Sequence, residues 1–356
     1  MTVLRVRASE IRGQIGEILA RIHYRGDHVL VERRGKPIAA IIGIEEYNRL
    51  IELQRQWEAA QHRRRFEAIR ASAEEHHLSE EEAFQLLEGA EEETLQIAIQ
   101  IAHEAGEMVR RAFPRTSLSA VNLKGDVNPV TETDIAVERH IVGRLRAAFP
   151  DHRILAEEGG GDAWQAPGPP IWLIDPLDGT NNFAHGFPHV GISLALVVEG
   201  EPVVGVIYDP LRDETFAAVA GGGATLNGEP IRVSAVSRLE DAFLATGFPY
   251  DRRTAPDNNT ERMARFVRRA LGVRRAGAAT LDLAYVACGR FDGFWEIRLA
   301  PWDVAAGILL VREAGGRVTA FDGVSTPLSG ATIVASNGLI HDQMLAVVRE
   351  PVSGKL

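Results

Sequence analysis

The segment Asp175-Pro-Leu-Asp-Gly-Thr180 places two carboxylates three positions apart, directly after the apolar run at residues 171–174. Such a run predicts a buried strand, so both acids are expected where that strand ends. Pro176 restricts the backbone and Gly179 permits an unusual backbone angle, so that both acids and the Leu177 carbonyl can point into one small volume. These are hard oxygen ligands, which Mg²⁺ prefers, usually together with a phosphate.

Three more segments carry acids in similar settings. Asp134 opens a predicted helix, Glu157 and Glu158 follow a short apolar run, and Asp303 opens the helix predicted over residues 301–314. Taken singly, each acid reads as a helix cap or a solvated charge. If the carboxylates converge, their repulsion raises some pKa values strongly unless cations neutralise the site. The combination therefore indicates metal ions.

Other chemical signals are weaker. The triple glycines at 159–161 and 221–223 lack the Gly-Lys-Ser/Thr ending of a phosphate-binding loop, so they predict loops or tight turns. His76 and His77 lie in a polar stretch and are expected to be solvated. The single cysteine, Cys288, excludes an internal disulfide and a thiolate zinc cluster.

The elements that must position these acids alternate between helical and strand patterns. Helices are predicted over residues 93–112 and 134–149, and a β-hairpin over residues 190–198 and 202–208. This mixture predicts an α+β fold, a layered α/β arrangement with mixed sheets, and not a purely parallel doubly wound sheet.

Length and charge divide the chain unequally. Its 356 residues predict about two domains. Residues 1–75 hold 14 Lys+Arg and 11 Asp+Glu, a net charge of +3. Since the whole chain has a net charge of −10, residues 76–356 carry −13. An acidic body does not attract nucleic acid, so any DNA contact is expected in the first segment. No membrane span or signal-peptide core is found in the sequence, and a cytoplasmic protein without membrane contact is expected.

The first 75 residues are predicted to form a small α+β unit. Apolar residues recur at helical spacing behind the capping candidate Ser9, and two apolar runs at 28–31 and 38–42 flank a turn, which predicts a hairpin. A second, Arg-rich helix is predicted from about Glu45. An acidic linker follows at residues 76–92, so the predicted domains are residues 1–75 and 93–350, on either side of that linker.

The order of the acids resembles that of the inositol monophosphatase family of lithium-sensitive, magnesium-dependent sugar phosphatases. The match spans residues 93–350. The signature segments are Trp172-Leu-Ile-Asp-Pro-Leu-Asp-Gly-Thr-Asn-Asn-Phe183 and Trp302-Asp-Val-Ala-Ala-Gly-Ile308, followed by Glu313-Ala-Gly-Gly316. The resemblance implies an αβαβα sandwich with mixed sheets, a phosphoric monoester hydrolase and a homodimer.

The same resemblance implies a set of metal ligands. It assigns Glu157, Asp175 and the Leu177 carbonyl to one Mg²⁺, and Asp175, Asp178 and Asp303 to a second. A third ion near Glu157 is implied as well, and lithium is expected to inhibit.

Catalytic roles follow from the resemblance in the same way. Thr180, supported by Asp134, is expected to orient and help deprotonate the attacking water, and Glu157 takes part through its metal. Lys124 has a lesser electrostatic role. The amides of Gly179 and Thr180 are expected to contact the phosphate, in a two-metal in-line displacement.

The resemblance places the substrate beside these groups. Its hydroxyls are expected at Gly277, Ala278, Ala279 and Glu296, with Asp178 and Asp303 nearby, and residues 247–250 are expected to line the mouth. A carboxylate such as Glu296 can accept hydrogen bonds from two hydroxyls, which suits a polyol, but it can equally meet an ammonium group. Inositol monophosphate is favoured, and histidinol phosphate, fructose bisphosphate and nucleotide phosphates stay open.

The first 55 residues resemble antitoxins of the Phd/YefM type, chiefly through the turn Arg33-Arg34-Gly35-Lys36-Pro37. That family implies a dimerisation domain that binds operator DNA, with a tail that wraps a toxin. Arg33, Arg34 and Lys36 are the candidate DNA contacts. Two alternatives stay open: a dimerisation module that no longer binds DNA, and a DNA-binding regulator whose phosphatase body mainly binds partners.

Overall fold

The structure is a computed structural model that describes residues 80–113, 121–123, 129–161, 165, 168–324 and 328–352. Near the N-terminus it describes residues 3–7, 10, 15–16, 18–19, 21–22, 28–33, 36–41 and 43. The chain divides into two compact units, residues 1–88 and 89–356.

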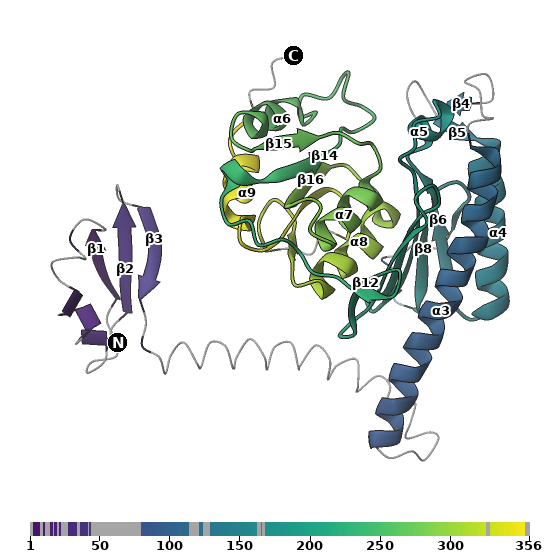
Figure 1. Cartoon of the computed structure of the whole chain (residues 1–356), viewed down its shortest axis with the longest axis horizontal. Helices are drawn as coiled ribbons and strands as arrows, with labels where there is room; N and C mark the ends of the chain where they lie inside the picture. The colour runs from purple at the N-terminus through teal and green to yellow at the C-terminus, as the bar shows by residue number, and fades with distance from the viewer. Residues whose placement is uncertain are drawn as a thin grey trace. The chain divides into compact units, whose positions relative to one another are not determined.

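The first unit contains a three-stranded sheet, drawn in purple in Figure 1. Its strands are β1 (Val3–Arg7), β2 (His28–Arg33) and β3 (Lys36–Ile41). β2 and β3 pair antiparallel, which confirms the predicted hairpin. β1 pairs parallel with β2, a strand that the sequence pattern did not predict.

A helical segment packs against this small sheet. The described positions between residues 15 and 22 are helical, and Ile18 and Ile22 are buried with Val29. The amphipathic helix is therefore confirmed at these positions. The capping candidate Ser9 and the Arg-rich helix predicted from Glu45 lie outside the described residues.

The second unit is built on an eight-stranded mixed sheet, whose order is β13-β12-β11-β10-β9-β8-β6-β7. β6 and β8 are parallel and the other neighbours are antiparallel, including the predicted hairpin of β9 and β10. The strands are β6 (Arg153–Ala156), β7 (Gly160–Gly161), β8 (Ile171–Asp178), β9 (Gly191–Val198), β10 (Glu201–Asp209), β11 (Glu214–Val219), β12 (Gly223–Leu226) and β13 (Glu229–Pro230).

A five-stranded mixed sheet lies beyond it, in the order β15-β14-β16-β18-β17. Its strands are β14 (Phe243–Thr246), β15 (Gly272–Arg274), β16 (Gly293–Ile297), β17 (Arg317–Thr319) and β18 (Thr332–Ser336). A separate short pair joins β4 (Val121–Leu123) to β5 (Pro129–Thr131).

Helices cover both sheets in layers, as Figure 1 shows. α3 and α4 cover one face of the large sheet, α7 and α8 lie between the sheets, and α6 and α9 cover the far face of the small sheet. The predicted αβαβα sandwich with mixed sheets is thus confirmed. The helices are α3 (Glu80–Ala112), α4 (Glu132–Ala148), α5 (Thr180–Ala184), α6 (Thr260–Val267), α7 (Ala279–Ala287), α8 (Pro301–Glu313) and α9 (His341–Val348), with a 3-10 turn η2 (Leu239–Asp241).

α3 shows how an amphipathic stripe fixes these layers. Ala98, Ile101, Ala105 and Val109, spaced three or four apart, are fully buried against the large sheet. Burying a large aliphatic side chain stabilises the fold by about 1.5–3 kcal/mol as an upper figure. The helix begins at Glu80, not near residue 93, so residues 80–92 of the predicted linker are helical. Within the described residues no helix is both long and apolar enough to cross a bilayer.

Candidate active site

The acidic motif lies at the end of β8, an interior strand of the large sheet that pairs with β9 and β6. The sequence placed Asp175 and Asp178 after the end of this strand, but β8 continues through Asp178 with a bulge. Pro176 has no N–H to give to the ladder, so the pairing with β9 shifts between Asp175 and Asp178. The bulge, and not a turn, therefore turns the two acids into the site.

The carboxylates of this region affect one another strongly. Asp175 is buried, and burial raises its pKa well above the usual range, helped by the Glu157, Asp178 and Asp303 carboxylates. Burial and then the Asp178 charge raise the pKa of Asp303 to about 8. The pKa of Asp178 rises to about 6 through burial, although hydrogen bonds from Thr280 oppose the shift. The predicted acids thus share one electrostatic environment.

Backbone amides orient three of these carboxylates. Leu177 N donates to Asp175 Oδ1 at 3.0 Å, Thr280 N donates to Asp178 Oδ2 at 2.7 Å, and Ala300 N donates to Asp303 Oδ2 at 2.7 Å. The last bond closes the N-terminus of α8. Such contacts hold an anionic group in place without supplying a full positive charge.

Thr180 and Asp134 form a hydrogen-bonded pair at the edge of the cluster. Thr180 Oγ1 lies 2.8 Å from Asp134 Oδ1, to which it donates, and 3.1 Å from the Leu177 carbonyl. Asp134 is buried in the first turn of α4. The pairing that the family resemblance implied is therefore present in the structure.

Gly179 connects β8 to α5 in a left-handed conformation, with φ of 91°. A Cβ at this position would lie 2.9 Å from the His189 carbonyl, so only glycine fits. Asn182 ties the surroundings together, because its Nδ2 donates to the carbonyls of His189 and Ala276 at 2.8 and 2.9 Å. The start of α5 is thereby held against the segment at 277–279.

The predicted substrate segment reaches the metal motif through Thr280. Gly277, Ala278 and Ala279 precede or begin α7, and the next residue, Thr280, donates to Asp178 Oδ2 from both its amide and its hydroxyl, the latter at 2.6 Å. Thr280 was not among the predicted site residues. No acid or glycine marks it in the sequence, and only its place after the 277–279 segment pointed toward it.

Glu296 on β16 is buried, and burial followed by the Asp282 charge raises its pKa well above the usual range. Gly247 lies directly against its carboxylate, so that a Cβ there would collide with both oxygens. Tyr250 is about half exposed. Burial, and after it the charges of Glu157, Asp178, Asp303 and Asp175, raise the pKa of Tyr250. Glu296 and Tyr250 therefore border the same acidic region.

Glu138 is a second residue that the sequence did not identify. It lies one helical turn after Asp134 on α4, is buried, and accepts a hydrogen bond at 2.6 Å from the amide of Glu158. The loop that carries Glu157 is thus anchored to the same helix face as the Thr180 partner. The spacing of four residues from Asp134 was the available signal.

Other predicted residues receive less support. Lys124 and Arg34 lie outside the described residues. Arg33 ends β2 opposite Lys36, which begins β3, so these two occupy paired positions beside the hairpin turn.

The acidic cluster offers the donor set that a hard divalent cation requires. Its carboxylates are buried among like charges, and such groups are stabilised by a cation. As it stands, no group of three or more His, Cys, Asp or Glu side chains within the described part of the chain is arranged to hold a metal ion. The oxygen donors of the cluster are of the chemical kind that a hard divalent cation such as Mg²⁺ prefers.

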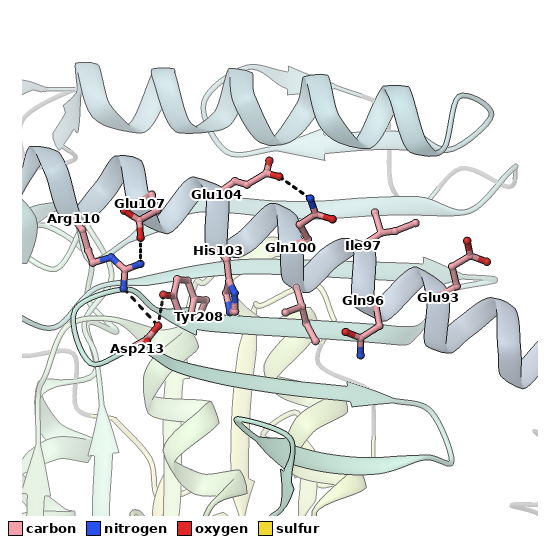
Figure 2. A pocket seen from close by; sticks show the side chains of 11 residues that line it. Glu93, Gln96, Ile97, Gln100, His103, Glu104, Glu107, Arg110, Tyr208 and Asp213 are labelled. Atoms are coloured by element: carbon pink, nitrogen blue, oxygen red, sulfur yellow. Dashed lines mark hydrogen bonds and ion pairs between the residues drawn. The ribbon is translucent and has the colours of Figure 1, made fainter.

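A groove elsewhere on the second unit is also rich in charge, and Figure 2 shows it along α3. Arg110 is paired with Glu107 and Asp213, and Asp213 also accepts a hydrogen bond from Tyr208 at 2.7 Å. Three acids of this groove, Glu104, Glu107 and Asp213, thus have partners within the protein.

The fold and the acidic site define a class of metal-dependent phosphatase. A model described as the inositol monophosphatase family matches residues 90–353, and the chain belongs to this family. It is therefore a phosphoric monoester hydrolase, and enzymes of the family are generally metal-dependent. A model of the Phd_YefM antitoxins of type II toxin-antitoxin systems matches residues 5–76.

Individual relatives agree with this assignment. The chain is 48% identical over 215 residues to an inositol-1-monophosphatase of Synechocystis, covering 60% of this chain and 75% of the relative. It is 45% identical over 258 residues to the Nus factor SuhB of Pseudomonas aeruginosa, covering 72% and 95%. The solved inositol monophosphatase of Anabaena superposes with a TM-score of 0.67 at 43% identity, covering 74% and 98% of the two chains.

Proposed function

We propose that residues 93–350 catalyse the Mg²⁺-dependent hydrolysis of a small phosphorylated polyol, with inositol monophosphate as the substrate. The observation that carries this proposal is the cluster of Asp175, Asp178 and Asp303 beside the Thr180–Asp134 pair. Buried like charges favour bound cations, and the hydroxyl–carboxylate pair favours activation of water.

The ions would be held by the acidic cluster and would neutralise it, activate the attacking water and stabilise the departing ester oxygen. Two or three Mg²⁺ ions are proposed, and lithium is expected to inhibit. The proposed ligands are Glu157, Asp175, the Leu177 carbonyl, Asp178 and Asp303.

Thr180 is proposed to position the water. Because its hydroxyl proton points to Asp134 Oδ1, the Thr180 oxygen can accept a hydrogen bond from the water. The water oxygen attacks phosphorus and its proton moves toward the Thr180–Asp134 pair. The ester P–O bond breaks, and a solvent water gives a proton to the leaving oxygen. The amides of Gly179 and Thr180, at the start of α5, are proposed to contact the phosphate.

Recognition of the polyol is assigned to the side of the site formed by β16 and the start of α7. Glu296 accepts hydrogen bonds from hydroxyls, while Gly277, Ala278 and Ala279 lie where α7 begins next to Thr280 and Asp178. The relative named inositol-1-monophosphatase supports a polyol in preference to histidinol phosphate, fructose bisphosphate or a nucleotide phosphate.

Phosphate release from a panel of these phosphate esters, with and without Mg²⁺, tests the proposal. The highest kcat/KM is expected for inositol 1-phosphate, and chelation of Mg²⁺ should abolish turnover. Preference for a nucleotide or histidinol phosphate would overturn the substrate assignment, and undiminished turnover in chelator would overturn the role of the metal.

The match to the antitoxin model supports a second proposal, for residues 1–75. We infer that this domain makes the protein a dimer and binds operator-like DNA through Arg33, Arg34 and Lys36, with residues 76–92 connecting it to the enzyme. A salt titration on duplex DNA from beside the protein's own gene tests this, because phosphate contacts predict affinity that falls steeply with salt. No binding at low salt would leave dimerisation, a toxin contact or partner binding as the role of this domain.

A further inference from the structure

Asn259 combines two unusual features at the start of α6. It has a left-handed backbone, with φ of 70°, and its side chain is buried. It occupies the N-cap position, but its side chain makes no capping hydrogen bond; instead, Asn258 Oδ1 accepts from the Thr260 amide at 3.1 Å. An asparagine at an N-cap usually caps its helix, so the side chain of Asn259 is committed elsewhere.

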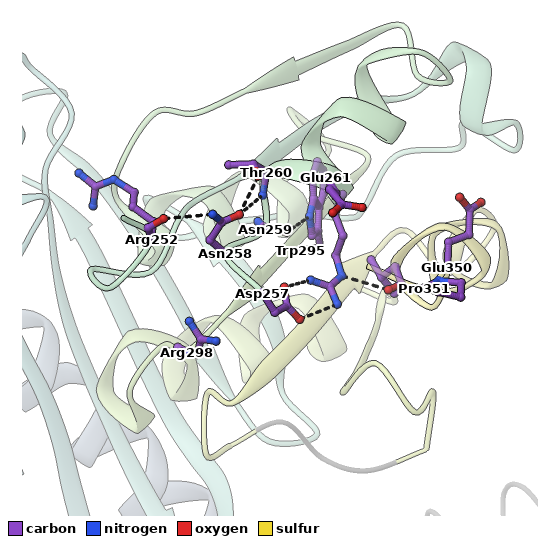
Figure 3. A network of polar contacts seen from close by, with 12 residues as sticks. Arg252, Asp257, Asn258, Asn259, Thr260, Glu261, Trp295, Arg298, Glu350 and Pro351 are labelled. Carbon is purple, nitrogen blue, oxygen red and sulfur yellow. Dashed lines mark hydrogen bonds and ion pairs between the residues drawn. The ribbon is translucent and has the colours of Figure 1, made fainter. Parts of the chain in front are cut away.

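The amide group of Asn259 joins two strands of the small sheet. Its Nδ2 donates to the Gly247 carbonyl at 2.7 Å and to Thr246 Oγ1 at 3.0 Å, and its Oδ1 accepts from Trp295 Nε1 at 3.0 Å. Figure 3 shows Asn259 and Trp295 facing each other in this network. Both ends of the amide are therefore used, and each contacts a different strand or its extension.

These contacts fall on the residues next to the proposed polyol site. Thr246 and Trp295 are partners in the parallel pair of β14 and β16, and Thr246 Oγ1 also donates to the Trp295 carbonyl at 2.6 Å. The residues that follow them, Gly247 and Glu296, are in contact, with the Glu296 carboxylate lying over the Gly247 Cα. A shift of either strand end would move Glu296.

The loop after Gly247 is tied down at two further points. Asn258 Nδ2 donates to the Arg252 carbonyl at 3.0 Å, and Arg298 pairs with Asp251 at 2.7 Å. Tyr250 lies in sequence between the anchor at Gly247 and these two, and its hydroxyl is affected by the charges of the acidic cluster. The first residue of the loop, Gly247, is thus held by the hydrogen bond from Asn259 to its carbonyl.

We propose that Asn259 is a positioning residue for substrate recognition, which holds the Glu296 carboxylate and the turn at residues 247–250 in the arrangement that receives the polyol hydroxyls. This inference rests on the proposed function, because it takes Glu296 as the group that binds hydroxyls. Asn259 acts through Gly247 and Trp295 and does not touch the substrate.

The variant Asn259→Gly tests this directly. Glycine adopts a positive φ without strain, so the backbone is kept and only the amide group is lost. The KM for inositol 1-phosphate should rise about ten-fold, because the three buried hydrogen bonds of the Asn259 side chain are lost and the Glu296 carboxylate is held less firmly. The kcat should stay within about two-fold, because the water-activating groups are unchanged. The Ki for inorganic phosphate should not change, since the proposed phosphate contacts are the amides of Gly179 and Thr180 and not Glu296.

Two further variants separate positioning from general destabilisation. Trp295→Phe keeps a ring against Phe266 but removes the donor to Asn259 Oδ1, and the KM should rise about three-fold with the Ki for phosphate unchanged. Asn337→Ala removes another buried asparagine, whose side chain donates to the Ser234 hydroxyl and the Val236 carbonyl and not to Gly247 or Trp295. This variant should leave both KM and the Ki for phosphate unchanged.

The outcomes distinguish the inference from the function on which it rests. If the wild-type protein does not hydrolyse inositol 1-phosphate with Mg²⁺, the proposed function fails. If it does, and Asn259→Gly and Trp295→Phe leave KM unchanged or shift KM and Ki for phosphate equally, the positioning role is overturned. Should Asn259→Gly fail to fold, the Trp295→Phe result decides.

Discussion

In two acidic regions of the same domain, the pKa values of the carboxylates are shifted in opposite directions. In the groove along α3, Glu104 binds Arg144 and accepts a hydrogen bond from His140 at 2.9 Å. Burial works to raise the Glu104 pKa, but the hydrogen bonds from Arg144 and His140 outweigh it, and the pKa is lowered. At the end of β8, burial and neighbouring acids raise the pKa of Asp175 well above its usual range.

The difference identifies where a cation is needed. In the groove, Arg110 pairs with Glu107 and Asp213 (Figure 2), and Arg144 pairs with Glu104, so these three acids are balanced by arginines of the protein itself. The acids at β8 have mainly backbone and hydroxyl donors, which orient them but do not neutralise them. The presence of charged groups in a cleft is therefore less informative about function than the direction in which the pKa values of those groups are shifted.

The comparison is tested most severely by Asp175→Asn. Turnover should fall about 10³-fold or more, because a buried ligand of the proposed metal site is lost. Without metal the variant should melt at a higher temperature than the wild type, since one charge is removed from a repelling cluster. Steady-state kinetics and thermal melting in chelator measure both.

Glu104→Gln is the matched control for that variant. It also neutralises a carboxylate, but one whose partner Arg144 then loses its counter-charge and whose hydrogen bond with His140 is weakened. Its melting temperature should fall slightly and its turnover should not change. Near-normal turnover of Asp175→Asn, or equal losses in both variants, would contradict the distinction between the two regions.

Thr180→Ala should have the next largest effect. The hydroxyl that donates to Asp134 is lost, and kcat should fall about 10²-fold while KM changes little, because orienting water acts on the transition state. Thr180→Ser should recover most of the activity. A change confined to KM would show that the hydroxyl binds substrate instead.

The raised pKa of Asp303 predicts a pH effect on the metal-free protein. Folding raises the pKa of Asp303 from its ordinary value of about 3.8 to about 8. The folded state therefore retains the proton, and stability falls as pH rises between about 4 and about 8. In chelator, the melting temperature of the wild type should therefore fall relative to that of Asp303→Asn between pH 6.5 and 8.

Two controls belong to this experiment. Comparison with Asp303→Asn removes the contribution of His341, whose pKa burial lowers to about 4 and which destabilises the protein at acid pH instead. Mg²⁺ should abolish the pH-dependent difference by raising the stability of the wild type at pH 8. A difference between the two proteins that stays constant with pH would show that Asp303 does not titrate in this range.

Removing residues 1–79 should have the smallest effect on catalysis. All the proposed ligands lie in the second unit, which has its own core, so kcat/KM should change by less than about two-fold. A large loss of activity in the shortened protein would place an obligatory coupling between the domains.

Local patterns predicted an α+β fold with mixed sheets and a cluster of acids, and the family resemblance implied the αβαβα order of the layers. The apolar run before Asp175 predicted β8, and the order of acids indicated the family that residues 90–353 match. These features depend on residues that are close in sequence, where periodicity and motif spacing carry the information.

Long-range contacts could not be predicted in the same way. Thr280 reaches Asp178 across 102 positions, and Asn259 reaches Trp295 across 36, with no local signal in either segment. The parallel pairing of β1 and the bulge at Pro176 likewise depend on which strand lies alongside. The sequence therefore indicated the acids but not the neutral side chains that hold them.

The most direct test of the account is to locate bound metal. In crystals soaked with Mn²⁺ as a substitute for Mg²⁺, anomalous scattering should show at least two peaks, bounded by the carboxylates of Glu157, Asp175, Asp178 and Asp303, and none in the groove beside Glu104. Absence of a peak at β8 in the presence of saturating Mn²⁺, or a peak in the groove alone, would contradict the claim that the buried acids at β8 are a cation site.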